Sequence, residues 1–130
     1  MRDVSYTTYW SYGSSGVKRK APLVDFVLDI LYLMENNGVI PPLHVLNEVL
    51  QGGGSNGGMG PGTAWRPFSI KEAEYKELVE ALLQLDIVEA KKSHRYMMFQ
   101  KVIVDESLHQ CSTYHDWLRA VATKYPPFSK

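Results

Sequence analysis

The sequence predicts an α+β fold: a central buried helix, two to three amphipathic helices and a small antiparallel β-hairpin or sheet. One observation is an almost continuously apolar run over residues 22–36. Another is the change, near residue 87, from helical spacing of apolar residues to spacing in twos. The chain has 130 residues, which is a common size for one domain, so we expect a single globular domain over 1–130.

The N-terminal segment 1–20 is predicted to contain a strand. Residues 4–12 are rich in Tyr, Thr, Val and Trp, and a turn cluster of Gly and Ser follows at 13–16. The aromatic residues of this strand fall on both of its faces. The basic triplet Lys18-Arg19-Lys20 comes next, and we interpret it as a solvated segment. The rival interpretation is a contact with phosphate or with an acidic partner.

The first helix is expected to begin at Pro22, whose fixed φ suits the first turn, and to end before Gly38. Its residues are apolar nearly all round, which is typical of a buried helix. Asp25 and Asp29 lie one turn apart. Paired carboxylates of this kind suit acid–base chemistry, but we predict a polar edge that reaches solvent.

A second, amphipathic helix is expected from Pro41-Pro42 to Leu50, followed by a glycine-rich loop over residues 51–63. Seven of the ten glycines of the chain fall in this loop. The loop lacks the G-x-x-x-x-G-K-[ST] pattern and follows a helix, so a phosphate cradle is disfavoured. It is either a plain connector or a contact loop with Met59, Trp65 and Phe68 as apolar anchors.

The rest of the chain predicts a helix, a hairpin and a last helix. Ser69 and Glu72 form a capping box before a helix that runs to about Leu85. Strands at 87–90 and 95–104 form the hairpin. Thr113 caps the last helix, which ends at Pro126-Pro127.

The order of three helices and a hairpin resembles a winged helix, in which the hairpin is the wing. Lys91, Lys92 and Arg95 at the hairpin tip would then contact a nucleic-acid backbone. The helix in the position of a recognition helix, over 69–85, carries four Glu and two Lys. Its negative charge disfavours contact with phosphate.

His109, Cys111 and His115 are the candidate metal ligands. Their spacing matches no structural zinc pattern. Cys111 and His115 also fail as a nucleophile and base, because no orienting group or oxyanion site accompanies them. We therefore predict no enzymatic activity, no cofactor and no metal.

The charge of the chain is balanced, with 14 Lys and Arg against 14 Asp and Glu. A nucleic-acid or membrane-surface binder usually carries a basic excess, so both classes are disfavoured. The single cysteine and the lack of an apolar segment at the N-terminus favour a cytoplasmic protein without a membrane segment.

Together these observations predict a non-enzymatic binding module that acts through protein–protein contacts, with a partner or with a second copy. The expected anchors are aromatic and apolar residues outside the core helices: Trp10, Tyr12, Met59, Trp65 and Phe68. An equally weighted explanation is that such residues cover the core. The alternative function is nucleic-acid binding by the basic hairpin tip at 91–95.

Overall fold

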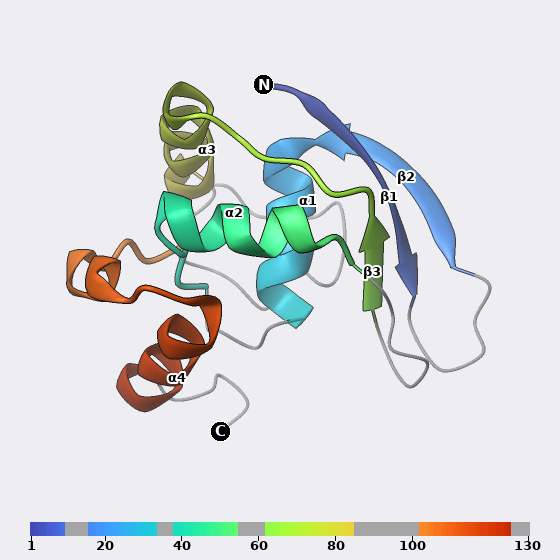
Figure 1. The fold of residues 1–130 in the computed structure, drawn as a ribbon. Coiled ribbons are helices and arrows are strands. Elements are labelled where there is room, and N and C mark those ends of the chain that lie inside the picture. Colours follow the sequence, from blue (N-terminus) through green and yellow to red (C-terminus); the bar gives the residue numbers. More distant parts are fainter. Residues whose placement is uncertain (10–15, 34–37, 55–61, 85–101, 126–130) are drawn as a thin grey trace.

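A computed structural model describes residues 1–9, 16–33, 38–54, 62–84 and 102–125. Within these ranges three strands form an antiparallel sheet in the order β2-β1-β3, accompanied by four α-helices and one short 3-10 helix. Figure 1 shows the sheet on one side of the molecule and the helices on the other. The α+β prediction is therefore confirmed.

The central strand β1 (Asp3–Tyr9) confirms the predicted N-terminal strand, although Trp10 and Tyr12 lie outside the described residues. β2 (Val17–Pro22) pairs with one edge of β1, and β3 (Gly62–Trp65) pairs with the other. The basic triplet 18–20 lies inside β2, where Lys18 and Lys20 are exposed, as the prediction of a solvated segment expected, whereas Arg19 is half-buried. Alternation along the strand explains this, because it keeps both lysines in solvent while Arg19 turns toward the helices.

The helix α1 (Leu23–Leu33) is the predicted core helix, and it begins directly after Pro22, the last residue of β2. It packs against all three strands, and Phe26 is fully buried between it and the sheet. The prediction of a solvent-exposed polar edge was wrong for Asp29, whose side chain is 0% exposed. Asp29 is buried because the Tyr6 hydroxyl and the Arg19 guanidinium both reach it.

The helix α2 (Leu43–Gly52) runs two residues beyond its predicted end. The carbonyl oxygen of Leu50 accepts hydrogen bonds from the backbone N–H groups of Gly53 and Phe68 and from the indole of Trp65. These bonds satisfy a carbonyl that a helix end leaves without an intrahelical donor. The glycine-rich segment is thus a loop only in part, because Gly52 closes α2 and Gly62 begins β3.

The helix α3 (Glu72–Gln84) begins later than predicted. Its first backbone acceptor is Lys71 rather than Ser69, so the capping-box prediction was wrong. The side chain of Asn47 explains the delay: it accepts from the backbone N–H of Ile70 and donates to the Ile70 carbonyl. These two bonds hold the chain extended against α2 just before the helix starts.

The predicted hairpin falls mostly on residues 85–101, which lie outside the described residues. Its basic tip lies there too, so the resemblance to a winged helix stays a prediction. The end of its second strand is described. There, Ile103 forms a parallel bridge to Val39 and does not join the three-stranded sheet.

The C-terminal part consists of the 3-10 helix η2 (Glu106–Gln110) and the helix α4 (Tyr114–Lys124). The predicted cap is confirmed, since the hydroxyl of Thr113 accepts from the backbone N–H of Asp116 at 3.1 Å. Trp117 and Val121 of α4 are buried in a second apolar cluster, next to the main core. No helix in the described part of the chain is long and apolar enough to cross a membrane.

Candidate functional site

The two faces of the sheet differ sharply in chemistry. Along β1, Val4, Tyr6 and Thr8 are buried toward α1, while Ser5 and Thr7 point the other way. This follows from the two-residue period of a strand. We call the side that carries Ser5 and Thr7 the outer face. No described helix is packed against it, whereas α1 contacts the opposite side of all three strands (Figure 1).

The register of the sheet gathers positive charge around these two hydroxyls. Ser5 pairs with Lys20, and Thr7 pairs with Lys18. Paired residues of neighbouring strands share a face, so both lysines lie on the outer face. Arg66, one residue past β3, approaches from the other edge. All three cationic side chains are exposed.

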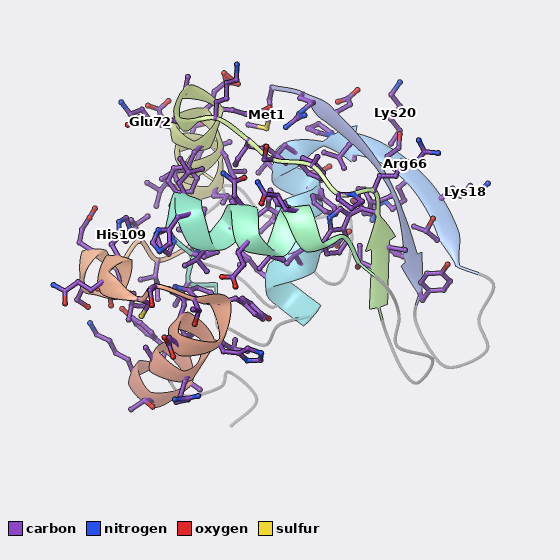
Figure 2. The ribbon with its side chains drawn as sticks, in the orientation of Figure 1. Met1, Lys18, Lys20, Arg66, Glu72 and His109 are labelled. Atoms are coloured by element: carbon purple, nitrogen blue, oxygen red, sulfur yellow. The ribbon has the colours of Figure 1, made fainter. Side chains whose placement is uncertain are left out.

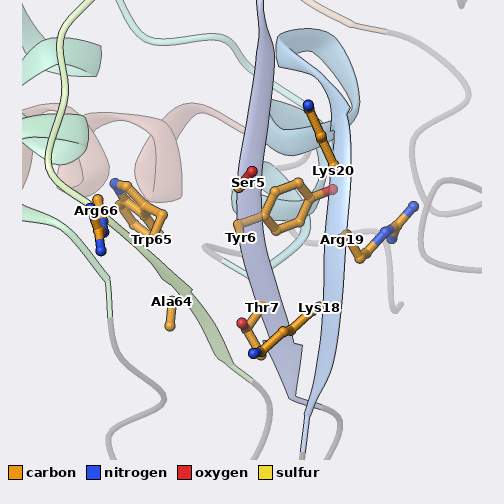
Figure 3. A pocket seen from close by; sticks show the side chains of 9 residues that line it. All are labelled: Ser5, Tyr6, Thr7, Lys18, Arg19, Lys20, Ala64, Trp65 and Arg66. Carbon is orange, nitrogen blue, oxygen red and sulfur yellow. The ribbon is translucent and has the colours of Figure 1, made fainter.

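A groove of about 570 Å³ lies over this part of the outer face. Nine residues line it, and Figure 3 shows Lys18 and Lys20 on one side of Ser5 and Thr7, with Arg66 on the other. We call this hollow the basic groove. A smaller hollow of about 230 Å³ adjoins it, because Ser5 and Arg66 line both.

Three of the four cations that line the basic groove have no acidic partner among the described residues, whereas the fourth, Arg19, is paired with Asp29. Arg2 is bound to Glu74 at 3.0 Å, and Lys124 is bound to Asp105 at 2.6 Å. Within the described part of the chain, three exposed cations of the groove form no ion pair: Lys18, Lys20 and Arg66. Their charge is therefore available to an anion from solution.

The Asp105 cluster illustrates what pairing does to a charged group in this chain. Hydrogen bonds from Lys124, then from Ser107 and Tyr125, hold the pKa of Asp105 well below its usual range. The same contacts raise the pKa values of Lys124 and Tyr125. These side chains tie η2 to the end of α4, which is a structural role.

A buried charge lies beneath the basic groove. The carboxylate of Asp29 in α1 accepts from the Tyr6 hydroxyl at 3.0 Å and from the Arg19 guanidinium at 3.4 Å. The guanidinium carbon also lies 5.7 Å from the centre of the Tyr6 ring. Arg19 is thereby directed toward the helix side, so the strand that carries Lys18 and Lys20 is fastened to α1.

Two of the predicted protein-contact anchors, Trp65 and Phe68, are among the described residues, and both pack against the core of this chain. Trp65 meets the ring of Phe26 edge-on at 5.2 Å, and Phe68 lies 5.8 Å from the same ring. Both are half-buried against the main core, which is the core-covering role. Trp10, Tyr12 and Met59 lie outside the described residues. The same holds for the alternative nucleic-acid-binding residues Lys91, Lys92 and Arg95.

The three candidate metal ligands lie in three separate settings. His109 in η2 is 3.7 Å from the carboxylate of Glu106, and the carbonyl of Cys111 lies 2.7 Å from a ring nitrogen of His44. His115 is exposed in the first turn of α4. Among the described residues no group of three or more His, Cys, Asp or Glu side chains is arranged to hold a metal ion.

Sequence reasoning reached the basic groove only in part. The triplet at 18–20 carried phosphate contact as the rival to a solvated segment, and the observed exposure of Lys18 and Lys20 is compatible with both interpretations. The alternation of Ser5 and Thr7 with the buried Val4, Tyr6 and Thr8 could have indicated the outer face, but the sequence prediction did not use it. Nothing in the sequence indicated that Arg66 belongs to this site, because β3 was not predicted.

Comparison of the chain with protein-family models, with curated proteins and with solved structures finds no match.

Proposed function

We propose that this protein is a non-enzymatic module that binds nucleic acid, with the phosphate backbone held in the basic groove on the outer face of the sheet. The observation that carries the proposal is the grouping of three exposed cations, none in an ion pair, around the hydroxyls of Ser5 and Thr7. Nucleic-acid binding draws most of its affinity from such neutralisation of phosphates.

The side chains of the groove suit phosphate in different ways. The planar guanidinium of Arg66 can donate two parallel hydrogen bonds to phosphate oxygens, and the lysine ammonium groups act as point charges. The hydroxyls of Ser5 and Thr7 add donors of the kind that contact phosphates in known complexes. Within the described residues, none of these three cations is in an ion pair that would have to break before it meets an anion.

An apolar protein interface is less well supported by the described surface. Stable protein contacts usually have an apolar centre with aromatic anchors. The large hydrophobic residues that are exposed in the described ranges are scattered: Met1, Val17 and Leu83. A protein partner or self-association through Trp10, Tyr12 and Met59 stays a prediction.

The balanced charge of the whole chain is compatible with this proposal because the charges are separated in space. Four glutamates lie on α3, while Lys18 and Lys20 lie on β2 and Arg66 directly follows β3. Figure 2 shows Glu72 at the far side of the molecule from Lys18 and Lys20. We propose a cytoplasmic location as well, because the chain has a single cysteine and cannot form an internal disulfide.

Lysines on an edge strand also protect proteins from edge-to-edge aggregation. That role accounts for Lys18 and Lys20 without any ligand, and it predicts that their removal changes solubility but not binding. The proposal predicts that removing these lysines weakens the binding of nucleic acid, so one experiment distinguishes the two explanations.

The test is a fluorescence-anisotropy titration of a labelled single-stranded oligonucleotide of mixed sequence, repeated over a range of salt concentrations. The triple variant Lys18→Gln/Lys20→Gln/Arg66→Gln is compared with a matched control of equal charge change, Lys71→Gln/Lys76→Gln/Arg119→Gln. We expect the groove variant to lose affinity at least tenfold and its log–log salt slope to shrink by roughly 2, at about 0.7 per phosphate contact. Equal affinities of the two variants would refute the proposal.

A further inference from the structure

We infer that the smaller hollow beside the basic groove holds an unpaired guanine base of the bound nucleic acid, and that the carboxylate of Asp3 accepts hydrogen bonds from this base. This inference rests on the proposed function and names its ligand more narrowly, as a single strand that contains guanine. It comes from the place of the hollow in the sheet, from the acceptor at its rim and from the flat side chain beside it.

The smaller hollow lies where β1 and the chain after β3 move apart. The pairing of these two segments ends at Tyr6 and Trp65. Figure 1 shows the chain then leaving the sheet toward α3, and the backbone N–H of Phe68 donates to the carbonyl of Leu50 in α2. The volume of about 230 Å³ is below the roughly 300–1,000 Å³ of pockets for drug-sized ligands, so the hollow suits a single flat ring system.

The same divergence leaves part of the edge of β1 open. The carbonyl of Arg2 accepts from the backbone N–H of Leu23, so Arg2 directs its backbone groups toward β2. Successive residues of a strand direct these groups to opposite sides, so the N–H and the carbonyl of Asp3 face the hollow. Among the described residues, no backbone group pairs with them there. The hollow therefore offers one main-chain donor and one main-chain acceptor to a ligand.

Asp3 also places a carboxylate at the rim of the hollow. It is the first residue of β1, it is exposed, and it lies in line with Ser5 and Thr7 on the outer face. In the part of the chain that the structure describes, its side chain forms no hydrogen bond and no ion pair. A carboxylate repels a phosphate, but it accepts hydrogen bonds from N–H groups. The phosphates therefore belong over the cations of the basic groove, and a hydrogen-bond donor belongs at Asp3.

Guanine fits this acceptor better than the other bases do. Its N1–H and its 2-amino group are adjacent donors, so they can reach the two oxygens of one carboxylate together. Cytosine and adenine offer one amino group next to a ring acceptor, and thymine and uracil offer one N–H between two carbonyls. In a duplex the two guanine donors are engaged in base pairing, so the base must be unpaired, as in most sequence-specific recognition of RNA.

A fixed flat group also lines the hollow. The guanidinium of Arg2 donates two hydrogen bonds to the carboxylate of Glu74, at 3.0 and 3.1 Å, and one to the carbonyl of Ser69 at 3.0 Å. It lies over the ring of Phe68, with its central carbon 4.9 Å from the ring centre. These contacts fix its orientation, while 43% of the side chain is exposed. Bases stack on guanidinium planes, so Arg2 can support the base that Asp3 binds.

An exposed aspartate near a sheet edge also occurs without any ligand, because charge there prevents association between sheets. In that case its removal would change the affinity for every oligonucleotide alike, by removing one repulsive charge. A preference between bases distinguishes the two explanations, because a general change in charge or stability does not alter it.

The experiment measures, by fluorescence anisotropy, the affinity of the protein for three labelled 12-nucleotide strands, a length within the range of about 4–16 nucleotides for single-strand sites. One strand is all thymidine, and the other two carry one central guanine or one central hypoxanthine, which lacks the 2-amino group. The wild type should bind the guanine strand at least about fivefold more tightly than the thymidine strand, which is the lower end for a bidentate contact with a base. The hypoxanthine strand should bind with intermediate affinity.

Asp3→Asn should bind the guanine and thymidine strands equally, and its affinity for the thymidine strand should rise because a repulsive charge is removed. Glu80→Gln is the matched control, since it removes one exposed carboxylate from α3 and should keep the wild-type preference. Circular dichroism melting of both variants shows whether a change in binding comes from unfolding.

The outcomes separate the two claims. Equal binding of the guanine strand and either other strand by the wild type, or a guanine preference that survives in Asp3→Asn, overturns the inference while the proposed function stands. Failure of the wild type to bind any of the strands, or full binding by the triple groove variant, overturns the proposed function itself.

Discussion

At the scale of single residues, the contact between Asp29 and Tyr6 connects the core to the candidate site. A fully buried carboxylate is costly unless donors and a cation satisfy it. Here a phenol from β1 and a guanidinium from β2 meet at one oxygen of Asp29 in α1. One charged side chain therefore fixes two strands on the helix, and those strands carry Ser5, Thr7, Lys18 and Lys20 of the basic groove.

Asp29→Asn should lower the free energy of unfolding by about 2 kcal/mol, because a buried hydrogen bond to a charged group is worth about 1.5–3 kcal/mol. Tyr6→Phe should cost a similar amount. Since both variants break the same contact, the double variant should be more stable than the sum of the two losses predicts, by about 1 kcal/mol. Urea denaturation at pH 7 measures all three, and strictly additive losses would contradict the coupling.

Tyr75 gives a prediction for alkaline pH. Burial, followed by the charge of Glu106, raises the pKa of Tyr75 from 10.0 to about 12, and its hydroxyl donates to the carbonyl of Pro41 at 2.7 Å. The unfolded chain ionises this tyrosine near pH 10, and the folded protein does so only near pH 12. Its contribution to stability is therefore complete below pH 10 and is lost between pH 10 and 12.

Tyr75→Phe should accordingly lose less stability than the wild type when the pH rises from 9 to 11.5. Burial also raises the pKa of Tyr114, but that residue is common to both proteins and cancels in the comparison. Denaturant titrations at the two pH values provide the measurement. Parallel losses in the two proteins would mean that Tyr75 ionises alike in the folded and unfolded chains.

At the scale of elements, helices with strong local signals could be predicted and short strands could not. The apolar run of α1 and the Thr113 cap of α4 are local features, and both were found where the sequence indicated. β2 and β3 depend on pairing with β1, since β2 is largely basic and β3 has only four residues. The basic groove was missed with them, because it exists only when three separate segments meet.

The close approach of Gly54 to β3 explains one end of the glycine-rich segment. A Cβ atom at Gly54 would lie 2.0 Å from Cζ3 of Trp65 and 2.4 Å from the carbonyl oxygen of Thr63. At Gly52, the last residue of α2, an added Cβ would meet nothing within 4 Å. The close approach of β3 therefore requires a glycine at position 54, whereas no contact requires one at position 52.

Gly54→Ala should destabilise the protein by about 1–3 kcal/mol, because the new methyl group displaces the Trp65 ring or the β3 backbone. Gly52→Ala is the matched control, and it should be neutral or slightly stabilising because alanine favours the helix. Thermal unfolding of both variants provides the comparison. Equal effects of the two substitutions would show that Gly54 does not need to be glycine.

At the scale of the whole molecule, the distribution of charge over the surface matters more for binding than the net charge does. The net charge is zero, yet the sheet presents cations and α3 presents glutamates on another side (Figure 2). Charges more than about 10 Å apart are largely screened from one another at 0.1 M salt. A polyanion at the outer face therefore experiences mainly the nearby charges, which are the three groove cations and the exposed carboxylate of Asp3 in β1. The cations outnumber this carboxylate, which is how a neutral chain can bind a polyanion there.

The most direct test of this account is an NMR titration of the ¹⁵N-labelled protein with a single-stranded oligonucleotide of mixed sequence. We predict that the amide shift changes concentrate in β1, in β2 and at residues 62–66, and that the triple groove variant abolishes them at the same concentrations. Shift changes confined to the basic segment 91–95, with the three strands unaffected, would contradict the account and move the site to the predicted hairpin tip.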